Sequence, residues 1–238
     1  MKPIAIFRHS PTEGPGYFAT YLDAHRLPWR LIKIDEGATV PAGSADFSGL
    51  CFMGGPMSVN DGIAWIAPVL SLIREAVAAD VPVIGHCLGG QLMSKALGGT
   101  VTRNPVKEIG WGPIKVEPNA EARQWLGGID EFQSFHWHGE TFTIPQGAVR
   151  LAGSPYCANQ AFVMGRHLGM QCHVEITPPM IETWCREWTR EKEGEKLRRV
   201  AGPSVQTPEQ MQAGMEDKAA ALHQVADRLY DRWVAGLA

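Results

Sequence analysis

The chain has 238 residues, of which 45% are hydrophobic and 20% charged, and its formal net charge at pH 7 is −3. A chain of this size forms one large globular domain or two small ones, and its charge excludes the basic surface typical of proteins that bind nucleic acids or anionic membranes. We expect a soluble protein, because no apolar run reaches the roughly 20 residues of a membrane-spanning helix and residues 4–7 are too few for a signal peptide.

Short apolar runs alternate with segments of helical periodicity through the first hundred residues. Strands are predicted at residues 4–7, 29–34, 49–53 and 81–85, and helices at 17–27, 64–79 and 88–97. This order predicts an α/β fold with a mostly parallel central sheet flanked by helices. Ligands of such sheets bind at the carboxyl ends of the strands, which is where Cys87 falls.

The middle of the chain differs from this pattern. Residues 101–169 are rich in Gly and Pro and lack long helical periodicity, so we expect strands and hairpins there, including residues 151–154, 160–165 and 168–173.

The last sixty residues turn helical. Pro178 and Pro179 open a helix, and the run 186–199, whose charges are mixed in sign, is typical of a solvated helix face. A final helix places an apolar stripe on one side, which favours core packing: Met211, Met215, Leu222, Leu229 and Trp233. We predict an enzyme domain at residues 1–177 and a helical C-terminal extension, residues 178–238, packed on the same domain.

The five cysteines show no pattern of a disulfide framework. They are Cys51, Cys87, Cys157, Cys172 and Cys185, an odd number without regular spacing and without a CxxC pair. We therefore expect neither a structural zinc site nor any other metal or cofactor, and a reducing, cytoplasmic location.

Cys87 stands between a predicted strand and a predicted helix in the sequence GHCLGG. Small residues around such a turn (Gly85, Gly89 and Gly90) relieve the crowding at its apex, and the helix N-terminus favours a thiolate. A buried core cysteine is the simpler alternative, but the surrounding glycines favour a nucleophile.

A cysteine nucleophile needs a histidine base, and the histidine needs an acceptor that orients it. His173 and Glu175, two positions apart at the end of an apolar run, can share one strand face, so that Glu175 holds the imidazole. His86 adjoins Cys87 and should point away from it. His136 and His138 fit the wall of the pocket or its hydrogen-bonding support better.

The segment FMGGPMSVND, residues 52–61, follows another predicted strand. Two glycines and a proline make a rigid turn with open backbone N–H groups, which suits an oxyanion hole as well as it suits an ordinary turn. A phosphate site is disfavoured, because the chain contains neither GxxxxGK[ST] nor GxGxxG.

Taken in order, GGP-x-S, G-x-C-x-G-x-Q and H-x-E resemble the triad-type class I glutamine amidotransferases. The resemblance is greatest to the amidotransferase domain of GMP synthetase and its stand-alone relatives, and KEIGW, FHWHGETFTIP and CANQAFVMG extend it over about residues 40–177. It implies the flavodoxin-like architecture of that family. It also implies a catalytic triad, in which Cys87 is the nucleophile, His173 the general base and then acid, and Glu175 the orienter of the histidine.

The resemblance further implies which residues surround the substrate. The backbone N–H groups of Gly55 and Leu88 would form the oxyanion hole. Gln91 would contact the bound glutamine, with the backbone of Gly139 and Glu140 near its amino acid end. The implied reaction is attack of Cys87 on the side-chain amide, loss of ammonia and hydrolysis of a γ-glutamyl thioester.

Several alternatives stay open. Amidotransferase domains usually feed a synthetase, so either a separate synthetase subunit exists or the chain is a free-standing hydrolase of glutamine or of another γ-glutamyl peptide or amide. A cysteine enzyme of the α/β-hydrolase type is disfavoured, because its acid precedes the histidine. A non-catalytic interaction protein on this fold is a further alternative, and the sequence leaves a homodimer open. Val174 replaces the proline usual in the family's His-Pro-Glu, which we expect to lower preorganisation and spare the charges.

Overall fold

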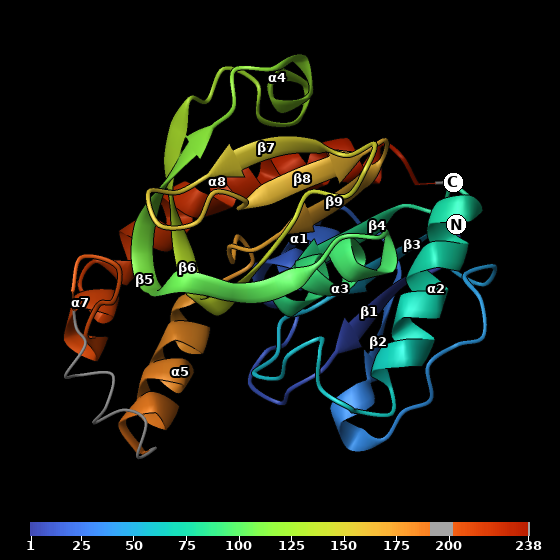
Figure 1. The fold of residues 1–238 in the computed structure, drawn as a ribbon, viewed down its shortest axis with the longest axis horizontal. Helices are drawn as coiled ribbons and strands as arrows, with labels where there is room; N and C mark the ends of the chain where they lie inside the picture. Colours follow the sequence, from blue (N-terminus) through green and yellow to red (C-terminus); the bar gives the residue numbers. More distant parts are fainter. Residues whose placement is uncertain (191–201, 238) are drawn as a thin grey trace.

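The computed structural model describes residues 1–190 and 202–237 (Figure 1). Most of the charge run at 186–199 therefore lies outside the described residues.

Within the described residues, one sheet runs through the molecule in the strand order β2-β1-β3-β4-β9-β8-β7-β5-β6. Its first half is parallel and consists of β2 (Trp29–Lys33), β1 (Ile4–Arg8), β3 (Gly49–Phe52), β4 (Val83–His86) and β9 (His167–Met170). Its second half is antiparallel and consists of β8 (Ala161–Met164), β7 (Val149–Gly153), β5 (Val101–Val116) and β6 (Glu131–Phe142). The predicted α/β fold is confirmed, and the hairpin-rich middle supplies the antiparallel half.

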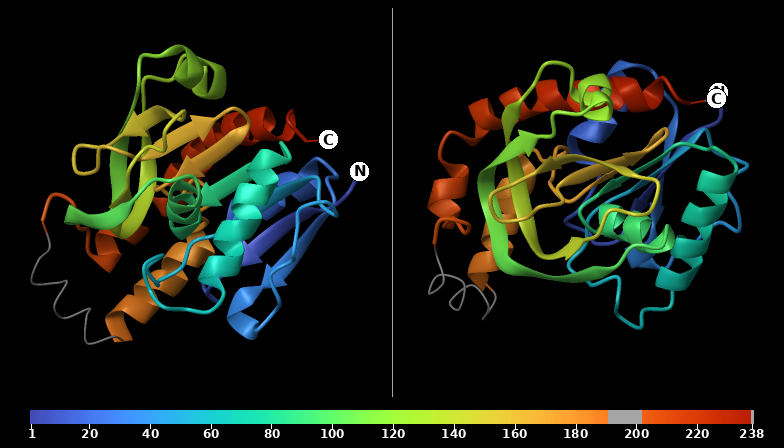
Figure 2. Two further views of the ribbon diagram at one scale, coloured as in Figure 1. Left: turned by 45° about the vertical axis from the view of Figure 1, so that its right-hand side comes forward. Right: turned by 45° about the horizontal axis from the view of Figure 1, so that its top comes forward.

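Helices cover both faces of the parallel half, which explains why its central strands are apolar throughout. Alternate residues of β1 point to opposite faces: Ile4 and Ile6 pack toward α1 (Gly16–Ala24) and α8 (Met215–Val234), whereas Ala5 and Phe7 pack toward α2 (Ile66–Ala78) and α3 (Leu88–Ala96). Figure 2 shows these two helix layers on either side of the sheet.

The remaining helices are short or lie at the periphery. They are the 3-10 helix η1 (Ile34–Glu36), α4 (Ala120–Leu126), α5 (Pro178–Arg190) and α7 (Pro208–Gln212). Helix α4 was not predicted, although Asn119 caps it by accepting a hydrogen bond from the backbone N–H of Ala122. A helix of seven residues is too short to show the periodicity on which the prediction relied.

The predicted final helix is interrupted. Ala213 is extended and Gly214 has a left-handed backbone (φ 64°), so α7 ends before α8 begins at Met215. The apolar stripe is nevertheless core: Tyr230 and Trp233 of α8 are fully buried, and Tyr230 packs edge-on against Phe18 of α1. The hydroxyls of Tyr17 and Tyr21 donate hydrogen bonds to α8, to Asp227 (2.7 Å) and Asp231 (2.6 Å). Helix α8 thus completes the core of the first 177 residues.

None of the described helices is both long enough and apolar enough to cross a membrane.

Because Trp233 fills the space above Gly49 of β3, Trp233→Ala should lower the free energy of unfolding by about 3–5 kcal/mol. Chemical denaturation measures this loss. Trp29→Ala removes a partly exposed indole from the edge strand β2 and should cost clearly less. Equal losses in the two variants would contradict the role given to α8.

Candidate active site

Cys87 lies at the carboxyl end of β4 and is the N-cap residue of α3, with an unusual backbone conformation (φ 50°, ψ −106°). A non-glycine residue rarely adopts positive φ, and such strain persists only where the surrounding structure enforces it. Here the glycines on α3 enforce it, because a Cβ on Gly89 would overlap the carbonyl group of Phe52 and a Cβ on Gly90 that of Met170. The helix can therefore approach the sheet closely enough to hold Cys87 at the apex of a sharp turn.

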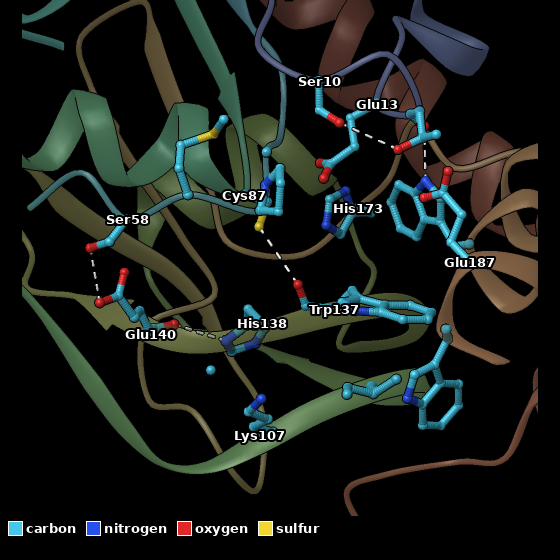
Figure 3. Close-up of a pocket in the computed structure, with 18 of the residues that line it drawn as sticks. Ser10, Glu13, Ser58, Cys87, Lys107, Trp137, His138, Glu140, His173 and Glu187 are labelled. Carbon is cyan, nitrogen blue, oxygen red and sulfur yellow. Dashed lines mark hydrogen bonds between the residues drawn. The ribbon is translucent and has the colours of Figure 1, made fainter. Parts of the chain in front are cut away.

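His173 is held beside Cys87 by its backbone and by its ring (Figure 3). Its backbone N–H donates to the carbonyl oxygen of Phe135 (2.9 Å), and its Nδ1–H donates to Oε1 of Glu175 (2.7 Å). The indole of Trp184 packs edge-on against the ring, with centroids 5.0 Å apart. Strand β9 ends at Met170, so His173 and Glu175 lie in a turn after the strand, and the expectation of a strand through residue 173 was wrong.

Burial and charge act in opposite directions on His173. Burial lowers the pKa of the imidazole, but the negative charge of Glu175 and the nearby Cys87 outweigh burial and raise the pKa well above its usual value. Burial likewise raises the pKa of the Glu175 carboxyl, yet His86 and His173 lower it to below its usual value overall. The arrangement therefore stabilises both charged forms, the imidazolium of His173 and the carboxylate of Glu175.

His86, the other histidine next to Cys87, points to the opposite side of the sheet. Its Nδ1 lies 3.8 Å from Sγ of Cys51, and its Nε2 lies 3.2 Å from the hydroxyl of Tyr230 and 3.9 Å from Oε2 of Glu175. Burial lowers the pKa of His86, and the nearby charge of Glu175 opposes this effect. His86 therefore lies behind Glu175 without a hydrogen bond to it, and it does not act on Cys87.

Gly55 and Leu88, the predicted oxyanion residues, lie next to each other, and Gly55 lines the pocket. A Cβ on Gly55 would come within 2.5 Å of the Met57 sulfur and 2.7 Å of a Leu88 methyl group, so Gly55 is closely packed against both side chains. Leu88 is the first residue of α3, and its backbone N–H has no acceptor within the helix. The geometry is compatible with two adjacent N–H donors near Cys87.

The predicted substrate residue Gln91 lines the pocket but already has a partner. Its side-chain N–H donates to Oε1 of Gln171 (3.1 Å), and the amide of Gln171 in turn donates to Sγ of Cys87 (3.5 Å). Gln171 was not predicted from the sequence. The available signal was its place two positions before His173, since residues next to the histidine of a triad also lie near the nucleophile.

Gly139 and Glu140 lie on β6 and line the pocket, as Gln91 does, and Figure 3 shows Glu140 beside Ser58 at one end of it. The carboxylate of Glu140 accepts a hydrogen bond from Ser58 (3.0 Å), and its carbonyl oxygen accepts one from Nδ1–H of His138 (2.9 Å). The side chain of Lys107 lies against Gly139. A carboxylate and an ammonium at this end match the two charged groups of an amino acid.

His138 belongs to a buried cluster with Glu108 and His136. Within the described part of the chain, these three residues bring their side-chain nitrogen and oxygen atoms within 4.8 Å of one another and could hold a metal ion. The carboxylate of Glu108 already accepts hydrogen bonds from Ser154 (2.6 Å) and Gln160 (2.7 Å) and lies 3.0 Å from Nε2 of His138. These hydrogen bonds explain the cluster without a metal ion. They hold His138 in place, and His138 in turn holds the backbone of Glu140 through its Nδ1–H.

Cys87 opens into a cavity of about 400 Å³. Its lining includes four residues that were not expected at the site from the sequence: Glu13, Trp184, Glu187 and Trp188. Figure 3 shows Glu13 and Glu187 across Cys87 from Glu140. Three of the four lie on α5, so the C-terminal segment forms part of the pocket wall.

Comparison with known proteins gives a consistent picture. Residues 19–183 match the family model described as glutamine amidotransferase class-I. The glutamine amidotransferase-like protein YfeJ of Salmonella typhimurium is 32% identical over 184 residues, which are 73% of this chain and 76% of that protein. The glutamine-hydrolyzing GMP synthase of Acetivibrio thermocellus is 34% identical over 54% of this chain, which spans only 24% of that protein.

Solved structures agree over a greater length. The crystal structure of a glutamine amido transferase from Methylobacillus flagellatus superposes with a TM-score of 0.93 at 41% identity, covering 100% of this chain and 96% of that chain. A glutamine amidotransferase from Thermotoga maritima shares the fold, with a TM-score of 0.86 at 24% identity and 98% of each chain covered.

We expect iodoacetamide at mildly acidic pH to alkylate Cys87 first. Burial raises the pKa of the other four thiols, to about 12 for Cys172 and about 11 for Cys185, whereas Cys87 opens into the pocket beside His173, where the reagent can reach it. Peptide mapping after timed labelling measures the order.

The variant Glu175→Gln tests whether the pair of His173 and Glu175 is what makes Cys87 reactive. Removing the carboxylate lowers the pKa of His173, so the imidazolium is lost at lower pH and labelling of Cys87 near neutral pH slows. Labelling that spares Cys87, or that proceeds equally at all five cysteines, would rule out an activated thiol.

Proposed function

The chain belongs to the class I glutamine amidotransferase family, and we propose that it hydrolyses the side-chain amide of glutamine or of another γ-glutamyl compound through a thioester on Cys87. One observation carries this proposal: a cysteine in a strained turn faces a cavity beside a histidine whose Nδ1–H donates to a buried glutamate at 2.7 Å. A buried core cysteine needs neither the strain nor the partners. A purely structural protein would gain nothing from either, which disfavours the non-catalytic alternative.

The geometry supports a two-step reaction. The Cys87 thiolate attacks the amide carbon, and the backbone N–H groups of Gly55 and Leu88 receive the negative oxygen of the tetrahedral intermediate. With Nδ1 engaged by Glu175, Nε2 of His173 is the nitrogen left to protonate the departing amine. The C–N bond then breaks, leaving a γ-glutamyl thioester and neutral His173.

The second step reverses the roles of His173. A water molecule gives a proton to its Nε2 and attacks the thioester carbon, and the C–S bond breaks to release glutamate and the Cys87 thiolate. Glu175 keeps the ring oriented in both steps and stabilises the imidazolium that gives its proton in the first step and forms again in the second, while the amide of Gln171 donates to the sulfur as negative charge returns to it.

The amino acid end of the substrate fits the end of the pocket that holds Gln91, Gly139 and Glu140. The Glu140 carboxylate suits the α-ammonium group and Lys107 suits the α-carboxylate. Both glutamine and larger γ-glutamyl amides share this end, so it supports the substrate class and not a single member. Delivery of the ammonia to a separate synthetase subunit is the second candidate, because GMP synthases are among the relatives.

We expect Cys87→Ala and His173→Ala each to lower kcat for γ-glutamyl amide hydrolysis by about a thousandfold or more, and the double variant to lose little further, because the two residues act as a unit. Glu175→Gln should cost less, since Glu175 orients the ring without touching substrate. Release of ammonia or amine, measured with each purified variant, gives the comparison.

His25→Asn is the matched control, because His25 lies on the surface at the end of α1 and should leave kcat unchanged. A loss in His86→Ala or His138→Ala as large as that in His173→Ala would show that the base has been assigned to the wrong histidine.

A further inference from the structure

Two carboxylates and two indoles form the end of the pocket that faces away from Glu140. They belong to Glu13, Trp184, Glu187 and Trp188, which all line the pocket. Figure 3 shows Glu13 and Glu187 on the other side of Cys87 from Ser58 and Glu140. If the amino acid end of a γ-glutamyl substrate binds near Gln91 and Glu140, its leaving group must point toward this second end. An ammonia molecule is too small to contact these side chains together.

Glu13 lies in the wall next to the catalytic histidine. A Cβ on Gly54 would overlap Oε2 of Glu13 and lie 3.2 Å from Cε1 of His173, so the glycine leaves room for a carboxylate beside the imidazole. Burial raises the pKa of Glu13, the charge of His173 lowers it, and the charges of Glu175 and Glu187 raise it, which together bring the pKa to about 7. Among the described residues, no side chain donates a hydrogen bond to this carboxylate. Glu13 is half-buried and lines the pocket, and a carboxylate in this position is stabilised by a cation that binds beside it.

Helix α5 presents the other three residues. Trp184, Glu187 and Trp188 are three and four positions apart and therefore share one face of the helix. The indole N–H of Trp184 donates to the carbonyl oxygen of Thr12 (2.8 Å), which joins α5 to the loop that carries Glu13. Trp137 of β6 packs edge-on against both indoles, with centroid distances of 5.6 and 5.5 Å. The wall is thus aromatic and acidic, with packed indoles and the exposed carboxylate of Glu187.

We propose that this end of the pocket is a leaving-group subsite for an alkylamine with a distal ammonium group, so that the preferred substrate is the γ-glutamyl amide of a diamine. The inference rests on the proposed function and narrows it. Indole faces bind methylene groups and ammonium ions, and the carboxylates of Glu13 and Glu187 add charge-assisted hydrogen bonds. The same carboxylates repel the carboxylate of an amino acid leaving group, which disfavours γ-glutamyl peptides.

The chemistry of the proposed function is unchanged by this substrate. Cys87 displaces the amide nitrogen, which takes a proton from His173 and departs as the free diamine, while the distal ammonium group stays at the acidic wall until release. Water then hydrolyses the thioester as it would after loss of ammonia.

Four γ-glutamyl substrates test the proposal: the amide of diaminobutane, the neutral pentylamide of equal length, the anionic amide of aminobutyrate, and glutamine itself. We expect kcat/KM for the diaminobutane amide to exceed that for the pentylamide by about tenfold or more, and the aminobutyrate amide to be the poorest of the three long substrates. Glu187→Gln should reduce the preference for the diaminobutane amide over the pentylamide. Glu182→Gln makes the same charge change on α5 away from the cavity wall and should preserve it.

Binding to the Cys87→Ala variant gives a readout that does not need turnover. Calorimetry should find the diaminobutane amide bound more tightly than the pentylamide, and Glu187→Gln in the same background should weaken only the former. Equal affinities, or a preference for the neutral or anionic amide, would overturn the subsite. If the enzyme hydrolyses glutamine without any preference among the amines, the subsite alone fails. If it hydrolyses none of the four, the proposed function fails with it.

Discussion

The close approach of helix α3 to the sheet is the constraint on which the site depends. Gly89 and Gly90 allow the helix backbone to touch the carbonyl groups of Phe52 and Met170, and the chain can then leave β4 only through a turn with positive φ at Cys87. That turn aims the sulfur into the cavity and sets the first N–H groups of α3 beneath it. Larger side chains at either glycine would push the helix away and remove the strain together with the site.

The C-terminal helices complete this arrangement from two sides. Tyr230 of α8 lies next to His86, whose Nε2 lies 3.9 Å from Glu175, while Trp184 of α5 packs edge-on against His173. Glu175 and His173 are thus held between the two helices, although the sequence separates them from α8 by about forty residues. Substitutions in the C-terminal segment should therefore affect the chemistry as well as the stability of the fold.

Much of this could be predicted from the sequence, because the decisive features are local. Apolar periodicity predicted the strands and helices of the parallel half, and Gly residues around Cys87 indicated a sharp turn before any partner was known. Gln171, Glu13 and Glu187 could not be found in this way, since their importance arises from contacts between segments distant in the chain. The pairing of His173 with Glu175 was expected from strand alternation, but a turn after β9 brings the two side chains together instead.

Trapping of the covalent intermediate tests the central claim most directly. If Cys87 is the nucleophile, wild-type protein mixed with a γ-glutamyl amide and quenched in acid should gain the mass of one γ-glutamyl group on the peptide that contains Cys87, and Cys87→Ala should gain none. The adduct should disappear as substrate is exhausted. Turnover that leaves no adduct at Cys87 under any quench time, or an adduct on another residue, would contradict the account.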